Sequence, residues 1–137
     1  MSQKMKNLRE VTSKVIEQMF FMNEETVPDT YDAKYKYCAY IDHAELKINL
    51  CCGNDLTKIL TENFLGTEDF DENDMKDVLK EILNMIAGNY VGEYLREFPD
   101  SIPVPKIISF SKNAKSNNMP CETLFYEGLP LCISIED

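Results

Sequence analysis

Apolar residues recur at spacings of three and four over the first part of the chain, which is typical of a helix with one buried face. The residues that share this face are Met5, Leu8, Val11, Val15, Met19 and Met22. We therefore predict a helix over residues 4–22. Pro28, Asp29 and Asp32 follow it and favour an irregular connection.

The pattern then changes from helical periodicity to that of strands. Residues 35–41 are rich in Tyr, and residues 46–50 alternate between apolar and polar side chains. Both patterns predict strands, the second with one polar face. Residues 42–45 lie between the two segments as a turn, so we expect an antiparallel hairpin.

Two helices are predicted next, a short one and a long one. Asn54 or Asp55 is expected to cap the short helix, which ends near Gly66. An acidic run over residues 67–74 leads into the long helix, over about residues 72–97. Three prolines are expected to end the long helix and carry the chain onward: Pro99, Pro103 and Pro105.

The C-terminal part is predicted to add three strands. Residues 107–110 read as a short strand, and the polar residues 111–120 as a loop. Residues 124–126 and 131–135 flank Glu127-Gly128, which predicts a second hairpin. The fold class that follows is α/β of the α+β type, with long helices packed on a mixed, largely antiparallel sheet.

Length and charge narrow the function classes. The 137 residues fit one domain over 1–137, and 44% hydrophobic residues are enough for an ordinary core. The net charge is −10, and the Lys residues are scattered along the chain. Nucleic acid and anionic membranes need clustered Lys and Arg, so neither is expected as a partner.

Cysteine usage points to a cytoplasmic protein without a metal of its own. The five cysteines are Cys38, Cys51, Cys52, Cys121 and Cys132. They form no Cys-x-x-Cys pair, and the chain has one His, which argues against structural zinc. The N-terminus lacks the apolar segment of a signal peptide. We expect reduced, buried thiols, with adjacent Cys51 and Cys52 pointing to opposite faces of their strand.

Two weaker patterns do not change this picture. Asp69, Asp71 and Asn73 resemble the opening of a calcium-binding EF-hand loop, but Asp74 stands where Gly is required. Acidity at a helix N-terminus explains the run better. His43 falls in a predicted turn with no Ser or Cys partner nearby in sequence, so we expect a surface residue rather than a catalytic one.

The long helix carries the most information about function. When positions advance by about 100° per residue, its apolar stripe contains Met75, Val78, Leu79, Ile82 and Ile86. The opposite side presents a ladder of two carboxylates, a carboxamide and a glycine: Asp77, Glu81, Asn84 and Gly88. Exposed carboxylates on a helix commonly form only a solvated surface.

The amide and the glycines of this helix are harder to explain as a solvated surface. Asn84, Gly88, Asn89 and Gly92 lie within one short stretch. Each costs about 0.5 to 1 kcal/mol of helix propensity relative to Ala. Close docking of another molecule would give this accumulated cost a reason.

These residues resemble the signature helix of the CheC/CheX/FliY family of chemotaxis phosphatases. The family pattern is Asp or Ser, three residues, Glu, two residues and Asn, followed by a downstream Pro. Here it reads Asp77, Glu81 and Asn84, and the extended sequence EILNMIAGN over residues 81–89 resembles the CheX-like branch in particular. The order of elements and the closing segment 126–131 also agree with the family.

The resemblance has one departure, in the downstream proline. The family's proline usually comes 23 residues after the Asn, whereas Pro105 comes 21 and Pro103 comes 19 residues after Asn84. A small deletion in the connection would explain the difference, which leaves open which Pro corresponds.

The resemblance implies a phosphatase that hydrolyses the aspartyl phosphate of a CheY-type response regulator. Asn84 is then implied to orient the attacking water, and Glu81 to pair with the regulator's active-site lysine. Asp77 matches the first motif position as a supporting residue. Gly88 would let the partner approach the backbone closely, which is our inference from the helix face. The regulator supplies Mg²⁺, so no cofactor of the chain's own is expected, and the branch implies a possible homodimer.

The first helix contains a partial copy of the motif. Ser13 and Glu17 have the right spacing, but Phe20 stands where Asn is required. This fits a single-site family member whose first copy has lost its amide, and it fits an ordinary amphipathic helix equally well.

Two other functions remain open. A non-catalytic module could use the same helix to dock receiver domains or flagellar switch proteins, and the altered proline spacing favours such divergence. A small-ligand-binding or purely structural domain would leave the exposed Asp77, Glu81 and Asn84 face without a purpose.

Overall fold

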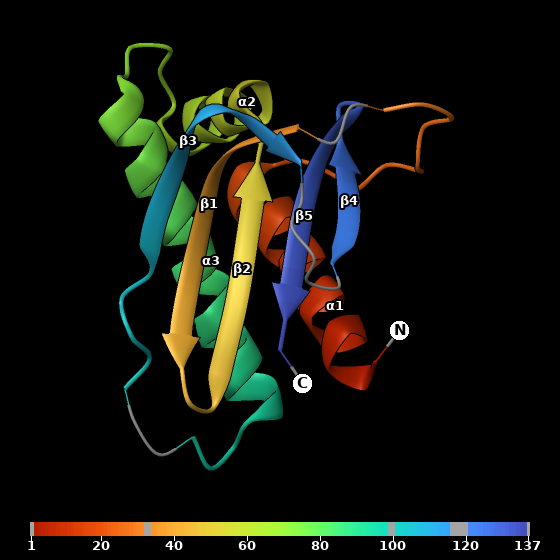
Figure 1. Cartoon of the computed structure of the whole chain (residues 1–137), viewed down its shortest axis with the longest axis vertical. Helices are drawn as coiled ribbons and strands as arrows, with labels where there is room; N and C mark the ends of the chain where they lie inside the picture. Colours follow the sequence, from red (N-terminus) through yellow and green to blue (C-terminus); the bar gives the residue numbers. More distant parts are fainter. Residues whose placement is uncertain (1, 32–33, 99–100, 116–120, 137) are drawn as a thin grey trace.

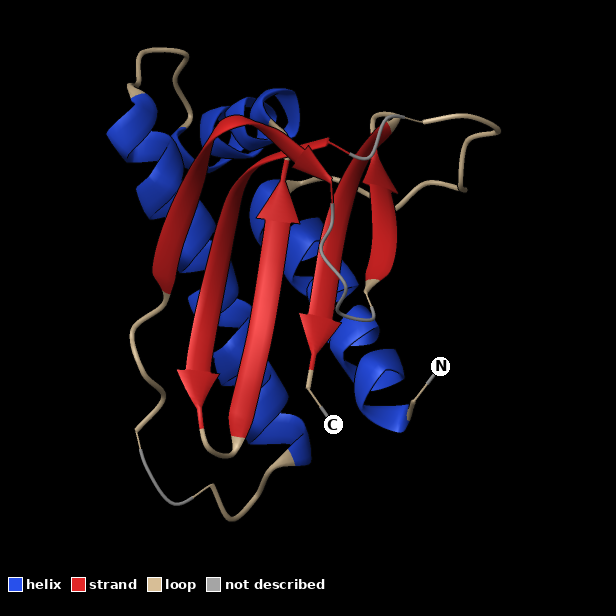
Figure 2. Ribbon diagram, in the orientation of Figure 1, coloured by secondary structure: helices blue, strands red, loops and turns tan. Residues whose placement is uncertain are grey.

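The computed structural model describes residues 2–31, 34–98, 101–115 and 121–136, which form three helices packed on one face of a five-stranded sheet (Figures 1 and 2). The helices are α1 (Gln3–Phe20), α2 (Asn54–Leu65) and α3 (Glu72–Tyr94). The strands are β1 (Lys34–His43), β2 (Leu46–Cys52), β3 (Lys106–Lys115), β4 (Glu122–Tyr126) and β5 (Leu129–Ile135). The predicted order of elements and fold class are confirmed.

All neighbouring strands are antiparallel, in the order β3-β1-β2-β5-β4. The two predicted hairpins, β1–β2 and β4–β5, therefore lie next to each other, and β3 returns to the free edge of β1. The turn of the second hairpin has Glu127 and Gly128 at positive φ, as the sequence Glu-Gly allows.

The core lies between the helices and the covered face of the sheet. Alternate residues of β1 contribute to it, among them Tyr37, Ala39 and Ile41. Each helix contributes one stripe, such as Leu8 of α1 and Ile82 of α3, both 0% exposed. The apolar residues whose spacing predicted the helices are thus largely the ones that the helices bury in the core.

Several helix ends differ from the predictions. Helix α1 ends at Phe20, because Phe21 adopts the left-handed conformation (φ 60°) and stops the helix two residues early. Neither Asn54 nor Asp55 caps α2, since Gly53 holds the N-cap position and makes no side-chain cap bond. Helix α3 ends at Tyr94 rather than near residue 97, where Leu95 leaves the helical conformation (φ −123°, ψ 69°).

The largest correction concerns residues 111–115, which were predicted as part of a loop. They continue β3, which pairs with β1 from Tyr40↔Lys106 to Lys34↔Lys115 across a register shift at Tyr35/Tyr37. An edge strand tolerates polar residues because only one side of its backbone is paired. The rest of the predicted loop, residues 116–120, lies outside the described residues.

The expectation of reduced thiols is wrong for two of the five cysteines. Cys38 and Cys51 face each other across β1 and β2 and form a disulfide. Cys52 and Cys132 are free and buried, and Cys121 is free and half-buried. Cys51 and Cys52 point to opposite faces with Cys52 buried, as predicted.

The described part of the chain lacks the features of a membrane-spanning helix and of a metal site. No helix there combines the length and apolar character that crossing a membrane requires. No group of three or more His, Cys, Asp or Glu side chains there is arranged to hold a metal ion.

Candidate functional site

Helix α3 begins with a reciprocal capping box made by the acidic run. The Asp71 carboxylate accepts from the backbone N–H of Asp74 at 2.9 Å, and the Asp74 carboxylate accepts from that of Asp71 at 3.0 Å. The two carboxylates satisfy backbone donors that a helix start leaves unpaired. Asp71, the middle one of the three EF-hand-like residues, therefore serves as the N-cap of α3.

The first turn of α3 is also tied to the sheet. Tyr37 of β1 donates its hydroxyl to Glu72 Oε1 at 3.3 Å, and Lys76 Nζ lies 3.7 Å from the same oxygen. Burial first, and then the negative charge of Glu72, raises the pKa of Tyr37, so its phenol remains a donor at neutral pH.

The buried stripe of α3 fixes the rotation of the helix. Its members are Met75, Val78, Leu79, Ile82, Leu83, Ile86, Ala87 and Tyr90. The four ladder residues therefore face away from the sheet, and all four are exposed: Asp77, Glu81, Asn84 and Gly88. The structure places the predicted site residues together on one face of α3.

The polar side chains of this ladder differ in what they contact. Asp77 Oδ1 lies 3.4 Å from Lys80 Nζ, in an exposed ion pair within the helix. Within the described chain, Glu81 and Asn84 make no hydrogen bond or ion pair through their side chains. Because their polar groups stay solvated, both are available to an incoming molecule without breaking an internal contact.

The glycines of this helix are not required by the fold. A Cβ atom added at Gly88 or Gly92 would meet nothing within 4 Å, and neither residue has a positive φ. Alanine at either position would favour the helix by up to about 1 kcal/mol. At Gly88 the absent side chain leaves the backbone beside Asn84 open to approach.

The partial motif copy in α1 does not form a second site. Glu17 is exposed and Ser13 half-buried, but Phe20 is 0% exposed and stacks on Phe64 with 5.3 Å between ring centroids. Asn63 Nδ2 also donates to the Phe20 backbone carbonyl at 2.9 Å. The position that the motif needs for an exposed amide is a core position in this chain.

His43 and the downstream prolines lie outside α3, the helix that carries the ladder residues. His43 ends β1, where its Nδ1 accepts from the Glu45 N–H at 3.0 Å and its ring packs on Phe98 at 5.0 Å. The predicted turn over residues 42–45 is therefore too long, because Asp42 and His43 pair with Lys47 and Leu46 as part of β1, and only residues 44 and 45 form the turn. Pro105 is buried directly before β3, and Pro103 is half-buried.

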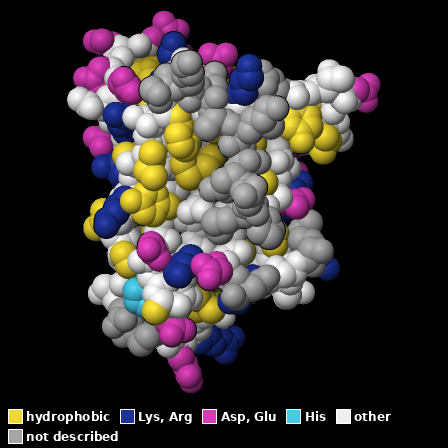
Figure 3. All heavy atoms as spheres, viewed as in Figure 1, with side chains coloured by type: hydrophobic (Ala, Val, Ile, Leu, Met, Phe, Trp, Pro, Cys, Tyr) yellow, Lys and Arg dark blue, Asp and Glu magenta, His cyan; other side chains and the backbone are white. Residues whose placement is uncertain are grey.

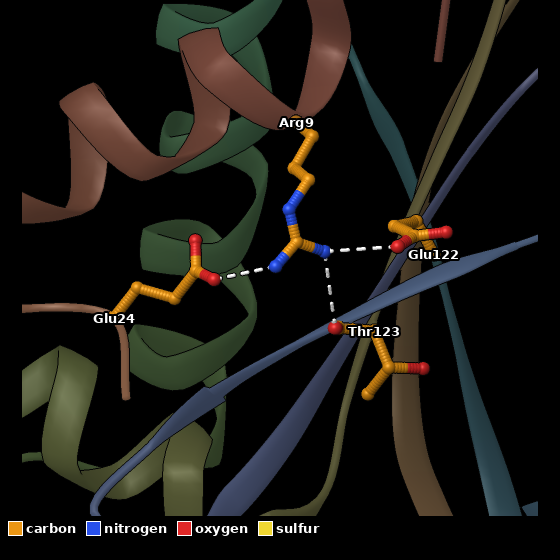
Figure 4. A network of polar contacts seen from close by, with 4 residues as sticks. All are labelled: Arg9, Glu24, Glu122 and Thr123. Atoms are coloured by element: carbon orange, nitrogen blue, oxygen red, sulfur yellow. Dashed lines mark hydrogen bonds and ion pairs between the residues drawn. The ribbon is translucent and has the colours of Figure 1, made fainter. Parts of the chain in front are cut away.

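Sequence reasoning missed a polar cluster around Arg9 of α1 (Figure 4). The Arg9 guanidinium binds Glu24 through Nη2, and through Nη1 it binds Glu122 Oε1 at 3.1 Å and the Thr123 carbonyl at 3.4 Å. The cluster joins α1, the segment after it and β4. No sequence signal could have found it, since 113 positions separate Arg9 from Glu122.

Comparison with family models places this geometry in a known group. The family model for "Chemotaxis phosphatase CheX" matches residues 38–126, which include α3 and its ladder. The chain belongs to the CheX family. The resemblance read from residues 77–92 is thereby confirmed at the level of the family.

Solved structures of CheX proteins share the fold. CheX from Vibrio vulnificus is 13% identical, with a TM-score of 0.73 and coverage of 98% of both chains. CheX from Desulfovibrio desulfuricans is 17% identical, with a TM-score of 0.75 and coverage of 98% of this chain and 99% of that one. At these identities the likeness shows the fold alone.

A third neighbour was solved together with other molecules. It is the CheX–CheY–BeF₃–Mg²⁺ complex from Borrelia burgdorferi, 16% identical, with a TM-score of 0.64 and coverage of 98% of this chain and 99% of that one. Among curated proteins, none matches the sequence significantly.

Proposed function

We propose that the protein is a cytoplasmic phosphatase that hydrolyses the aspartyl phosphate of a phosphorylated CheY-type receiver domain. The observation that carries the proposal is the exposed pair Glu81 and Asn84, which lie one turn apart on α3 and have no side-chain partner among the described residues. Membership of the CheX family, and a Borrelia relative solved with CheY, support this choice of substrate.

The main task of the enzyme in this reaction is to position the attacking water. An acyl phosphate is already activated, and hydrolysis needs a water in line with the phosphorus–oxygen bond that breaks. The water oxygen forms the new bond to phosphorus, and the receiver's aspartate leaves as a carboxylate. The Asn84 amide can accept a hydrogen bond from the water and donate another elsewhere without titrating near neutral pH.

Glu81 and Asp77 serve docking in this proposal. The Glu81 carboxylate, which no described residue contacts, is available to pair with a lysine of the receiver's active site, and this pairing would set the orientation of α3. Asp77 extends the same edge of the helix, and Gly88 lets the receiver approach the α3 backbone. The Mg²⁺ is supplied by the receiver in this scheme, and the protein contributes no cofactor.

The competing proposal is a non-catalytic module that docks receiver domains or flagellar switch proteins through the same face. The observation in its favour is the shortened spacing between Asn84 and Pro105. Intact Glu81 and Asn84 favour catalysis over this alternative.

Phosphate release separates the two proposals. Receiver domains from the same organism are phosphorylated with a small phosphodonor, freed from it, and mixed with catalytic amounts of the protein in excess Mg²⁺. A phosphatase accelerates phosphate loss with multiple turnovers. Binding to the phosphorylated receiver without acceleration would select the module.

The CheX-like branch also leads us to propose a homodimer that forms through the sheet. Light scattering coupled to size exclusion tests it directly. A mass of two chains at micromolar concentration is expected, and the mass of one chain would reject it.

A further inference from the structure

Three cysteines stand in a row across neighbouring strands. Cys38 of β1 is opposite Cys51 of β2, and Cys51 is opposite Cys132 of β5. Directly opposed residues of antiparallel strands point to the same side of the sheet. The residues flanking each cysteine in its strand belong to the core, so the row lies on the face that the helices do not cover.

This uncovered face is the one seen in Figure 3, where hydrophobic side chains gather at the surface in the region of β1 and β3. Ile108 of β3, which is opposite Cys38, is 47% exposed. Cys38 and Cys51 are themselves only half-buried. In the single chain, a dissolved reagent can therefore reach this pair from the solvent side of the sheet.

The backbone places the two cysteines directly opposite each other on neighbouring strands. The Cα atoms of Cys38 and Cys51 are 4.1 Å apart, near the narrower of the two spacings found in antiparallel ladders. The reduced state is also accommodated, because the Ala39 carbonyl oxygen lies 3.9 Å from Cys38 Sγ and can accept from its thiol.

We propose that Cys38 and Cys51 are a reversible thiol–disulfide site that closes and opens a covalent staple between β1 and β2. Its co-reactants are small disulfides in the oxidising direction and dithiols in the reducing direction. One cysteine thiolate attacks the small disulfide and releases its first thiol. The second cysteine attacks the mixed disulfide and releases the other thiol. Two electrons pass to the small disulfide, and a dithiol reverses both steps.

The remaining buried cysteines do not compete for this bond. Cys132 also stands opposite Cys51, but burial raises the pKa of its thiol. The nucleophilic thiolate of Cys132 is therefore scarce at neutral pH. Cys52 lies on the covered face, where burial raises the pKa of its thiol to about 12. The structure thus favours pairing of Cys51 with Cys38 over pairing with its other neighbour.

The staple acts on the hairpin at the centre of the sheet. It closes a loop with a sequence separation of 13 residues, which restricts the unfolded chain and favours the folded one. Cys38 directly follows Tyr37 in β1, and the Tyr37 hydroxyl donates to Glu72 in the first turn of α3 on the covered face of the sheet. The inference is independent of the phosphatase proposal, since it concerns the other face of the sheet.

Differential alkylation of the full chain tests the site. The protein is equilibrated with set ratios of oxidised and reduced glutathione, free thiols are blocked, and peptides are mapped by mass spectrometry. The expected result is a Cys38–Cys51 linkage that forms in oxidising buffer and disappears with dithiothreitol. Blocked thiols at both positions under all conditions, or a linkage of Cys51 to Cys132, would overturn the proposal.

Thermal unfolding supplies a second readout with matched variants. Reduction is expected to lower the Tm of the wild type by roughly 10 °C. Cys38→Ser should abolish the difference between oxidised and reduced protein, and Cys121→Ser should retain it. A redox-dependent Tm that persists in Cys38→Ser would contradict the assignment. If Cys38→Ser does not fold, the peptide map of the wild type still decides.

Discussion

Lys80 of α3 pairs with Asp77, and the adjacent Glu81 has no partner in the part of the chain that the structure describes. The Lys80 Nζ lies 3.4 Å from Asp77 Oδ1, and both side chains are solvent-accessible. Lys80 is the only basic residue between Asp77 and Glu81 in the sequence, and it contacts Asp77, so the Glu81 carboxylate is left available to an external cation. This separation of one neutralised and one available carboxylate underlies the docking role that we propose for α3.

The Lys80–Asp77 pair itself is expected to contribute little. Lys80→Met should change the free energy of unfolding by less than about 0.5 kcal/mol, because exposed ion pairs are screened by water and salt. Chemical denaturation measures this, with Lys14→Met, which removes the exposed Lys14–Glu10 pair of α1, as the matched control. A much larger loss for Lys80→Met alone would mean that the pair stabilises α3.

Glu81→Gln is predicted to weaken docking. It keeps the shape of the side chain and removes the charge, so a charge-assisted bond to a receiver lysine is lost and Kd rises roughly 10- to 100-fold. Titration calorimetry against a receiver bound to beryllofluoride measures the change. Glu17→Gln removes an exposed carboxylate at the equivalent motif position of α1 and should bind normally. Equal effects of the two substitutions would indicate general charge rather than a specific contact.

Gly88→Ala is predicted to separate stability from binding. The added methyl group meets no atom within 4 Å, so the helix gains up to about 1 kcal/mol and Tm rises by a few degrees. The same methyl group should weaken receiver binding, because it occupies the surface beside Asn84. Gly92→Ala, outside the ladder, should raise Tm without this loss. A Gly88→Ala variant that is stabler and binds unchanged would remove Gly88 from the docking surface.

Restoring the missing amide in α1 is predicted to destabilise the protein without creating a second site. Phe20 is 0% exposed, so Phe20→Asn should cost about 3 to 5 kcal/mol through lost packing and a buried amide. Phe21→Asn is the control, since Phe21 is 78% exposed and its positive φ suits Asn. A stable Phe20→Asn variant with doubled turnover would show that α1 is a dormant copy of the site.

The site face could be predicted from the sequence because local periodicity decides it. Once Met75, Val78 and Ile82 define the buried stripe, the rotation of α3 and the exposure of Asn84 follow. Features that depend on strand register could not be predicted in this way. The Cys38–Cys51 pair needs the pairing of β1 with β2, and the strand character of residues 111–115 comes from pairing with β1. Phe21 stops α1 through a backbone conformation that its side chain does not signal.

The most direct test of the central claim is the rate of phosphate loss from a phosphorylated receiver with saturating wild-type protein and with Asn84→Ala. If Asn84 positions the attacking water, the variant binds the receiver within about threefold of wild type but loses roughly 100-fold or more in turnover. Gln18→Ala, which removes an exposed amide from α1, should match the wild type in both measurements. An Asn84→Ala variant with full turnover would contradict the account.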